Sequence, residues 1–112
     1  MKLLRCVLQP HKLEELRAAL EGMGLHGMTV YEVKGHGRQK GHKEVYRGTE
    51  YHVSFLPKIM VEMAIPSEQV EKTISKIIEA IRSGKIGDGK IFISSLDDVI
   101  RIRTGERGPD AL

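Results

Sequence analysis

The chain has 112 residues, which fits one domain, and a formal net charge of +3 that is too small to indicate nucleic-acid binding by itself. Aromatic residues make up only 4% of the chain, so the core must be aliphatic. Cys6 is the single cysteine, which excludes an intrachain disulfide and favours a reducing compartment. The apolar runs are too short for a membrane span or a signal peptide, so we expect a soluble, cytoplasmic protein.

The first half of the chain predicts two strands on either side of a helix. Residues 3–8 predict a strand that Pro10 ends, and residues 28–34 predict the second strand. The helix over 11–23 is indicated by apolar residues at 3-4-3 spacing: Leu13, Leu16, Leu20 and Met23. Gly24 follows, where a helix end favours a left-handed residue.

The second half repeats strand, helix and strand, and adds a tail. Residues 59–65 alternate, and Ser67 is expected to cap the helix that follows. The buried stripe of that helix is expected to be Val70, Ile74, Ile77, Ile78 and Ile81. Residues 91–94 predict the fourth strand, 96–99 one helical turn and 100–104 a short fifth strand.

This βαββαβ order predicts an α+β, ferredoxin-like fold, in which an antiparallel sheet carries both helices on one face. If Val61 and Met63 face the helices, then Met60 and Ala64 lie on the open face of the sheet. An apolar open face on a small domain favours a partner, most simply further copies of the chain.

The segment 35–54 joins the two central strands and should be a hairpin, but it is about twenty residues long, far longer than a hairpin loop needs. It holds four glycines, many charges and few apolar residues. Loops of this length are usually functional or disordered. Half of its contour would reach about 30 Å from the sheet, far enough to enter a cleft of another protein.

A glycine-rich segment, S-G-K-I-G-D-G-K-I-F over 83–92, suggests an anion site together with two later arginines. On a strand, Arg101 and Arg103 would point to one side about 7 Å apart. Glycine lets backbone N–H groups approach an anion, and paired arginines neutralise it. The segment is not a Walker A loop, because no Ser or Thr follows the lysine. Alone it would be a turn; with the arginines it predicts a phosphate site, most simply for a nucleotide.

Several separate motifs resemble the PII signal-transduction proteins, in order and over essentially the whole chain. They are V-K-G-H-G-R-Q-K-G-H, Y-R-G-T-E-Y, F-L-P-K, the glycine-rich segment and R-I-R-T-G-E. The resemblance implies a homotrimer of ferredoxin-like subunits that binds ATP or ADP between subunits and 2-oxoglutarate beside Mg-ATP. It also implies a nitrogen-regulatory signalling protein that is not an enzyme.

The same resemblance divides the single domain, 1–112, into named loops. The T-loop (about 37–55) would dock on client proteins, the B-loop is the glycine-rich segment (about 82–90), and the C-terminal loop covers 102–112. Clients in the family include an ammonium channel, an adenylyltransferase, a uridylyltransferase, an acetylglutamate kinase and nitrogen-fixation regulators. The sequence does not say which of them applies.

Individual site residues are implied by resemblance alone. Those for the nucleotide are Thr29, Gly37, Arg38, Ala64, Gly87, Asp88, Gly89, Lys90, Arg101 and Arg103. Those for 2-oxoglutarate are Gln39, Gly41, Lys58 and Gly87, and Gln39 would also give its amide oxygen to Mg²⁺. Tyr51 is the candidate for uridylylation. Thr49 departs from the family pattern, which usually has Ala or Ser there.

The residues also allow two other functions and one metal site, each with weaker support. A nucleotide-hydrolysing enzyme would need a placed general base, and Asp88 is the only acid within the glycine motif. An RNA-binding domain would need strand aromatics, which the first strand does not have. A metal site of His36, His42 and His52 is conceivable, but their spacing matches no compact motif; His11 and His26 are expected at the surface.

Overall fold

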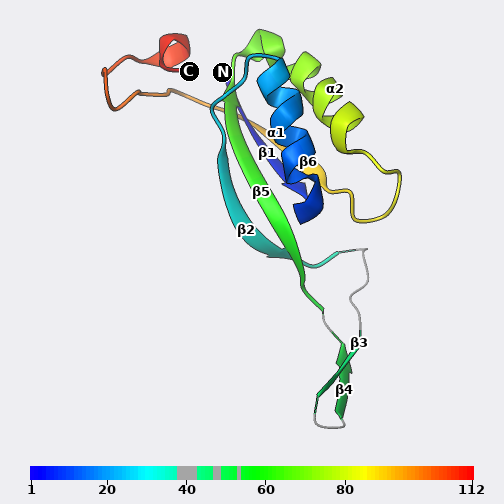
Figure 1. Ribbon diagram of the computed structural model, residues 1–112. Helices are drawn as coiled ribbons and strands as arrows, with labels where there is room; N and C mark the ends of the chain where they lie inside the picture. Colours follow the sequence, from blue (N-terminus) through cyan, green and yellow to red (C-terminus); the bar gives the residue numbers. More distant parts are fainter. Residues whose placement is uncertain (38–42, 47–48, 53) are drawn as a thin grey trace.

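The computed structural model describes residues 1–37 and 54–112 in full, and the backbone alone of 43–46 and 49–52. Four strands and two helices form the main body (Figure 1): β1 (Lys2–Leu8), α1 (Leu13–Gly22), β2 (Thr29–Gly35), β5 (Leu56–Ile65), α2 (Val70–Ile81) and β6 (Lys90–Ser95). Short 3-10 helices cover Pro10–Lys12, Ser67–Gln69 and Gly108–Ala111.

The four strands make one antiparallel sheet in the order β2-β5-β1-β6. Both helices cover one face of it (Figure 1). The two central strands, β1 and β5, are not neighbours in the sequence, because each helix connection carries the chain across the sheet. This is the ferredoxin-like arrangement, and the predicted fold class is confirmed.

The core lies between the helices and one face of the sheet. Every second residue of β5 from Ile59 to Ile65 is buried, as the two-residue period predicts, and β1 buries Leu4, Cys6 and Leu8. From the helices it receives Leu16, Leu20, Val70, Thr73, Ile77 and Ile81. Ile78 was expected in this stripe but is 42% exposed, because it lies at the edge of the helical face. Among the described residues, no helix is long and apolar enough to cross a membrane.

The two predicted helix-end signals have different outcomes. Gly24 ends α1 with φ 81°, its N–H donates to the Glu21 carbonyl, and the N–H of Leu25 donates to the Leu20 carbonyl. These bonds form a Schellman motif, and the predicted left-handed residue at Gly24 is confirmed. Ser67 does not cap α2 through its side chain, because a 3-10 turn precedes the helix and Gln69 is the N-cap residue. The Ser67 hydroxyl instead accepts a hydrogen bond from the Met1 amino group at 2.9 Å.

The open face of the sheet is apolar around one polar network. Leu3, Val7, Met60 and Ala64 lie on it half-buried, and Phe92 is 50% exposed. At its centre Glu62 Oε1 accepts hydrogen bonds from Tyr31 Oη at 2.6 Å and from Arg5 Nε at 3.1 Å. The three side chains come from adjacent strands and satisfy one another, so this face has few polar groups that require water.

The segment after β6 differs from the prediction. Residues 96–99 do not form a helical turn, and residues 100–104 do not form a strand. Ile100 makes a single bridge with Arg107, and the chain reverses between them. Asp98 organises this reversal, because its carboxylate accepts hydrogen bonds from Arg107 Nε at 2.8 Å and from the Gly108 N–H at 3.1 Å.

The long connection between β2 and β5 contains a second, two-stranded sheet. β3 (Lys43–Tyr46) pairs antiparallel with β4 (Thr49–His52), with Lys43 opposite His52 and Tyr46 opposite Thr49. Figure 1 shows this hairpin beyond the end of the main sheet. The sequence predicted the connection and not its internal strands.

Candidate functional site

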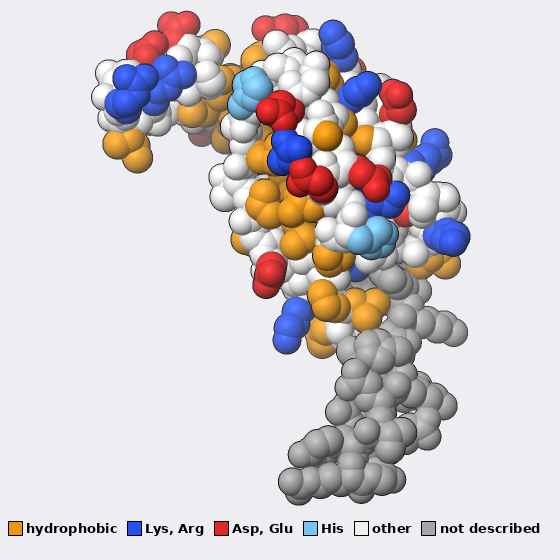
Figure 2. All heavy atoms as spheres, viewed as in Figure 1, with side chains coloured by type: hydrophobic (Ala, Val, Ile, Leu, Met, Phe, Trp, Pro, Cys, Tyr) orange, Lys and Arg blue, Asp and Glu red, His pale blue; other side chains and the backbone are white. Residues whose placement is uncertain are grey.

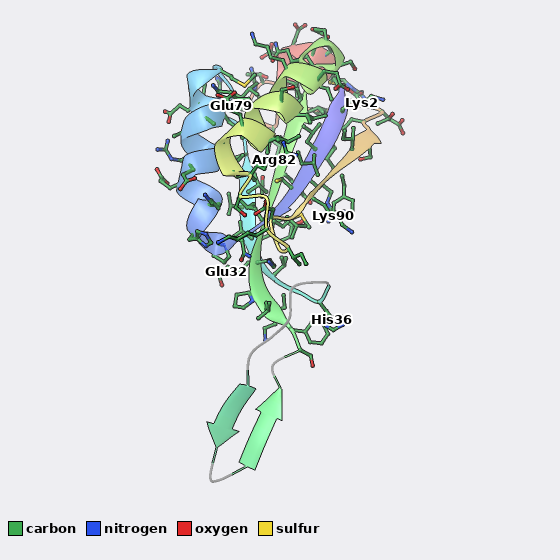
Figure 3. The ribbon with its side chains drawn as sticks, turned by 90° about the vertical axis from the view of Figure 1, so that its right-hand side faces the viewer. Lys2, Glu32, His36, Glu79, Arg82 and Lys90 are labelled. Atoms are coloured by element: carbon green, nitrogen blue, oxygen red, sulfur yellow. The ribbon has the colours of Figure 1, made fainter. Side chains whose placement is uncertain are left out.

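A hollow of about 670 Å³ opens at the end of the main sheet where β2 ends and β5 begins. We call it the glycine-loop pocket. It lies next to the loop 82–89 that joins α2 to β6. Five residues predicted to bind ligands line it: Gly37, Lys58, Gly87, Gly89 and Lys90. Figure 3 shows Lys90 on the same side of the sheet as His36, which also lines the pocket. A pocket of this volume is large enough for a small-molecule ligand.

Lys58 gives this pocket a buried cation. Its residue is only 8% exposed, and its Nζ donates a hydrogen bond to the Gly87 carbonyl oxygen at 3.1 Å. Burial lowers the pKa of Lys58, and the nearby Asp88 carboxylate partly offsets this effect. A desolvated ammonium beside exposed glycine backbone favours binding of an anion.

The loop needs glycine at specific positions. Gly87 and Gly89 have φ values of 102° and 112°, which side-chain-bearing residues rarely adopt. A Cβ atom on Gly89 would lie 1.7 Å from the Val7 carbonyl oxygen. Gly89 therefore lets the loop pass directly against β1, which places its backbone at the pocket.

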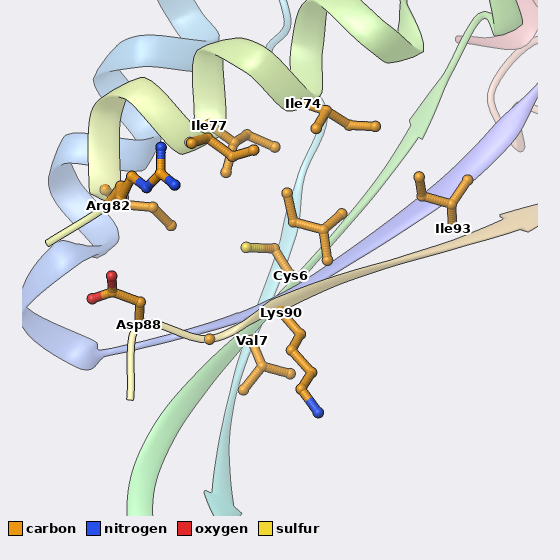
Figure 4. A pocket seen from close by; sticks show the side chains of 12 residues that line it. Cys6, Val7, Ile74, Ile77, Arg82, Asp88, Lys90 and Ile93 are labelled. Carbon is orange, nitrogen blue, oxygen red and sulfur yellow. The ribbon is translucent and has the colours of Figure 1, made fainter. Parts of the chain in front are cut away.

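Asp88 faces away from this pocket. Its carboxylate accepts hydrogen bonds from the N–H groups of Ser83 and Gly84, each at 2.9 Å, and from the Ser83 hydroxyl. These bonds, the Ser83 hydroxyl first, lower the pKa of Asp88. Figure 4 shows the Asp88 carboxylate near Arg82 at the end of α2, with the Lys90 side chain leaving in another direction. A carboxylate engaged in this way is poorly suited to act as the general base of a hydrolase.

The other predicted nucleotide residues lie elsewhere. Thr29 and Ala64 line a second hollow of about 820 Å³ with Glu62 and Leu112; we call it the tail pocket. It lies at the opposite end of β2 from the glycine-loop pocket, which Gly35 lines. Thr29 and Gly35 are six positions apart on this strand, a distance of about 20 Å.

The sequence predicted that Arg101 and Arg103 lie side by side on a strand. This prediction is wrong, because residues 100–104 do not form a strand. Arg101 Nη1 donates to Glu106 Oε1 at 2.9 Å, and its Nη2 donates to the Leu112 carbonyl at 3.0 Å. Arg103 lies in the turn 102–104 and is exposed. Neither is among the residues that line the glycine-loop pocket.

His36 is a pocket residue that sequence reasoning placed only in a possible histidine metal cluster. Its Nδ1 lies 2.8 Å from the Ser54 carbonyl oxygen, and its ring lies 5.5 Å from that of Phe55. It thus joins the two ends of the long connection. Its position beside Gly37 is the signal that could have indicated this role. Within residues 1–37 and 54–112, no group of His, Cys, Asp and Glu side chains could hold a metal ion.

Several predicted positions fall outside what the structure describes. Arg38, Gln39, Gly41 and His42 are not among the described residues, and neither are the side chains of Thr49, Tyr51 and His52. Their assigned roles therefore stay predictions.

Comparison with known proteins decides the family. The family model "Nitrogen regulatory protein P-II" matches residues 1–106. The chain belongs to the PII family. It is 54% identical over the full length of both chains to the nitrogen regulatory protein P-II of Rhizobium etli, and equally to that of Rhodobacter capsulatus. The same identity and coverage relate it to the nitrogen regulatory protein GlnK of Escherichia coli K12.

PII membership sets the broad function of this chain. It is a nitrogen-regulatory signalling protein, and the proteins of this family are not enzymes. The family also implies that it interacts with proteins of nitrogen metabolism.

Proposed function

We propose that this PII protein is an allosteric sensor that binds ATP or ADP and 2-oxoglutarate and works as a homotrimer in the cytoplasm. The observation that carries the proposal is the glycine-loop pocket, where Lys58, Lys90 and the backbone of Gly87 and Gly89 surround one hollow. Cations together with glycine backbone suit a polyphosphate. Cys6 is buried and its thiol is free, which accords with a reducing compartment.

The nucleotide would bind between two copies of the chain. Its expected residues form two groups: Gly37, Gly87, Gly89 and Lys90 at the glycine-loop pocket, and Thr29 and Ala64 at the tail pocket. Because the groups lie at opposite ends of β2, one nucleotide that touches both is best accommodated where these ends meet in adjacent copies. Arg101 and Arg103 belong to the projecting C-terminal segment, which would reach the phosphates of a site on the neighbouring copy.

The open face of the sheet supports assembly. Half-buried apolar residues surround the Arg5–Glu62–Tyr31 network, whose hydrogen bonds are made within one copy. Such a network can be covered by another subunit at little cost, because its polar groups are already paired. A 112-residue chain also gains burial from association.

The effector 2-oxoglutarate would bind beside the nucleotide. Lys58 would pair with its distal carboxylate, and Gln39, Gly41 and Gly87 would complete the site. Mg²⁺ would be held by oxygens of the phosphates, of the effector and of Gln39, since it prefers oxygen ligands. The effector should therefore need Mg-ATP, and coupling of about 1–3 kcal/mol is typical of such linked sites.

Because Gly37, Arg38 and Gln39 begin the T-loop, ATP, ADP and Mg-ATP with 2-oxoglutarate would favour different loop conformations. The T-loop would then dock on a client such as an ammonium channel, an adenylyltransferase or a uridylyltransferase. Tyr51, whose backbone lies in β4, would be the uridylylation site where such an enzyme is present.

Calorimetric titration of 2-oxoglutarate with and without Mg-ATP tests the sensor directly. Binding should be strong only when Mg-ATP is present. Equal binding in both conditions would contradict the linkage, and a protein that ignores adenine nucleotides would contradict the proposal as a whole.

A complementation experiment tests whether two copies share the site. Lys90→Gln removes a cation of the glycine-loop pocket, and Arg103→Gln removes a cation of the C-terminal segment that would reach the phosphates from the neighbouring copy. If these two cations meet across subunits, co-assembly of the two variants restores part of the ATP binding that each homo-oligomer has lost. If each copy holds its own complete site, mixing restores nothing.

A further inference from the structure

The glycine loop needs a constraint that its own residues do not supply. Gly84, Gly87 and Gly89 all have positive φ values. Glycine adopts many backbone conformations with similar energy, so a loop with three glycines has little intrinsic preference for one shape. The observed shape must be held by contacts.

Three contacts hold it. Lys58 bonds the Gly87 carbonyl from the pocket side, and the backbone of Gly89 packs against Val7 of β1. The third contact lies within the loop: the Asp88 carboxylate accepts from the N–H groups of Ser83 and Gly84 and from the Ser83 hydroxyl. The same hydroxyl accepts from the Lys85 N–H at 3.2 Å. We call the bonds among Ser83, Gly84, Lys85 and Asp88 the carboxylate clasp.

The backbone N–H groups that the clasp binds are not those of Gly87 and Gly89, the glycines that line the pocket. All of its N–H donors come from Ser83 to Lys85, ahead of Gly87. Asp88 lines the groove between α2 and β6 with Arg82 and does not line the glycine-loop pocket, whereas Gly87 lines that pocket alone and Gly89 lines both hollows. Figure 4 shows the Asp88 carboxylate on the side of Arg82, while the Lys90 side chain points in another direction. The carboxylate thus lies on one side of the loop, and the glycine backbone on either side of it reaches the other.

We propose that Asp88 is a positioning residue for nucleotide binding: through the carboxylate clasp it holds the backbone of Gly87 and Gly89 toward the phosphates, and its own side chain does not contact them. This inference rests on the proposed nucleotide site. A carboxylate aimed at a triphosphate would repel it. The clasp keeps that charge turned to the end of α2 and occupied by donors, so an acidic residue is compatible with an anion site. The Asp88 carboxylate is ionised at neutral pH, and the clasp bonds lower its pKa further below the ordinary value of 3.8.

The test compares Asp88→Asn with a matched control, Asp97→Asn, which removes an exposed carboxylate outside the clasp. Asparagine puts an NH₂ group where the clasp needs an acceptor. Affinities for ATP and AMP are measured by competition against a fluorescent ATP analogue. We expect Asp88→Asn to weaken ATP binding about tenfold or more, a loss of one preorganised set of contacts. AMP binding should change less, because the clasp shapes the polyphosphate end.

A second pair of variants and a spectroscopic signature separate positioning from general destabilisation. Ser83→Thr keeps the hydroxyl and should bind ATP like the wild type, whereas Ser83→Ala should bind it more weakly. In NMR spectra, the amide signals of Gly87 and Gly89, which are not adjacent to position 83, should shift in Ser83→Ala while those of the sheet stay in place. If Asp88→Asn does not fold, the Ser83 pair decides.

The outcomes are distinct. If wild-type protein binds ATP and Asp88→Asn binds it equally well, the inference is overturned and the proposed function stands. Equal loss of ATP and AMP affinity also overturns it, because that result indicates damage beyond the loop. If wild-type protein binds no ATP, both are overturned.

Discussion

The ammonium of Lys58 donates a hydrogen bond to the carbonyl oxygen of Gly87 at 3.1 Å, and so ties the strand that ends the long connection to the glycine loop. The two residues are 29 positions apart in the sequence. A ligand carboxylate that takes over Lys58 would have to compete with this bond. The glycine loop and the base of the T-loop are therefore physically linked before any ligand binds.

Lys58→Met should remove 2-oxoglutarate binding and change the pH dependence of stability. Burial lowers the folded-state pKa of Lys58 below its ordinary value of 10.5, so the unfolded chain binds this proton more tightly. Stability conferred by the wild-type residue therefore rises as pH rises toward 10.5, and the methionine variant lacks this rise. Urea unfolding of both proteins across this range measures the difference, and parallel pH curves would contradict the expectation.

Gly89→Ala should damage the protein far more than Gly84→Ala. Both positions have positive φ, but a Cβ on Gly89 meets the Val7 carbonyl at 1.7 Å, whereas one on Gly84 meets no atom within 4 Å. We expect a loss of about 3 kcal/mol or more at Gly89 and about 1–2 kcal/mol at Gly84. Denaturant titration checks this, and similar losses at both positions would show that β1 yields to the added methyl group.

Arg101→Gln and Arg103→Gln should each weaken ATP binding with little effect on stability. Arg103 is exposed, and the Arg101–Glu106 pair is a surface ion pair worth about 1 kcal/mol at most. Together the two changes should cost about 2–5 kcal/mol of ATP affinity if the arginines are desolvated in the complex. Arg17→Gln on α1, which removes another surface ion-pair cation, is the control. Unchanged calorimetric affinity in the double variant would exclude these arginines from the site.

Gln39→Glu should weaken 2-oxoglutarate binding much more than ATP binding. The new carboxylate places a negative charge beside a dicarboxylate ligand, while the phosphates keep their contacts at the glycine loop. Calorimetry with each ligand in turn gives the comparison, in which ATP serves as the internal reference. Equal losses for both ligands would count against the role of Gln39 in bridging metal and effector.

Local patterns predicted the main body well because its elements bury one regular face. The alternation from Ile59 to Ile65 and the spacing of Leu13, Leu16 and Leu20 both matched the observed burial. The same reasoning failed after β6. Ile100 and Ile102 alternate like a strand, but a strand needs a partner, and Ile102 is fully exposed at 100%. Gly105 and Gly108, with φ values of 72° and 67°, help the chain to turn back instead.

The candidate site was predictable in its parts and not in their arrangement. Glycines, lysines and arginines at motif spacing indicated an anion site. That Thr29 shares a hollow with Ala64, and Gly35 shares one with Lys58, depends on the pairing of β2 with β5, which no local pattern encodes. The direction of the Asp88 side chain likewise depends on donors at Ser83 and Gly84 in the folded loop.

By itself the sequence determined the fold class, the aliphatic core, the need for glycine near the anion site and the resemblance to the PII family, because these follow from composition, periodicity and spacing along the chain. Only the tertiary structure decided that Lys58 meets Gly87, that Gly89 packs on Val7 and that the residues predicted to bind the nucleotide separate into two groups. Those relationships depend on distances between residues far apart in the chain, and such distances exist only once the sheet has formed.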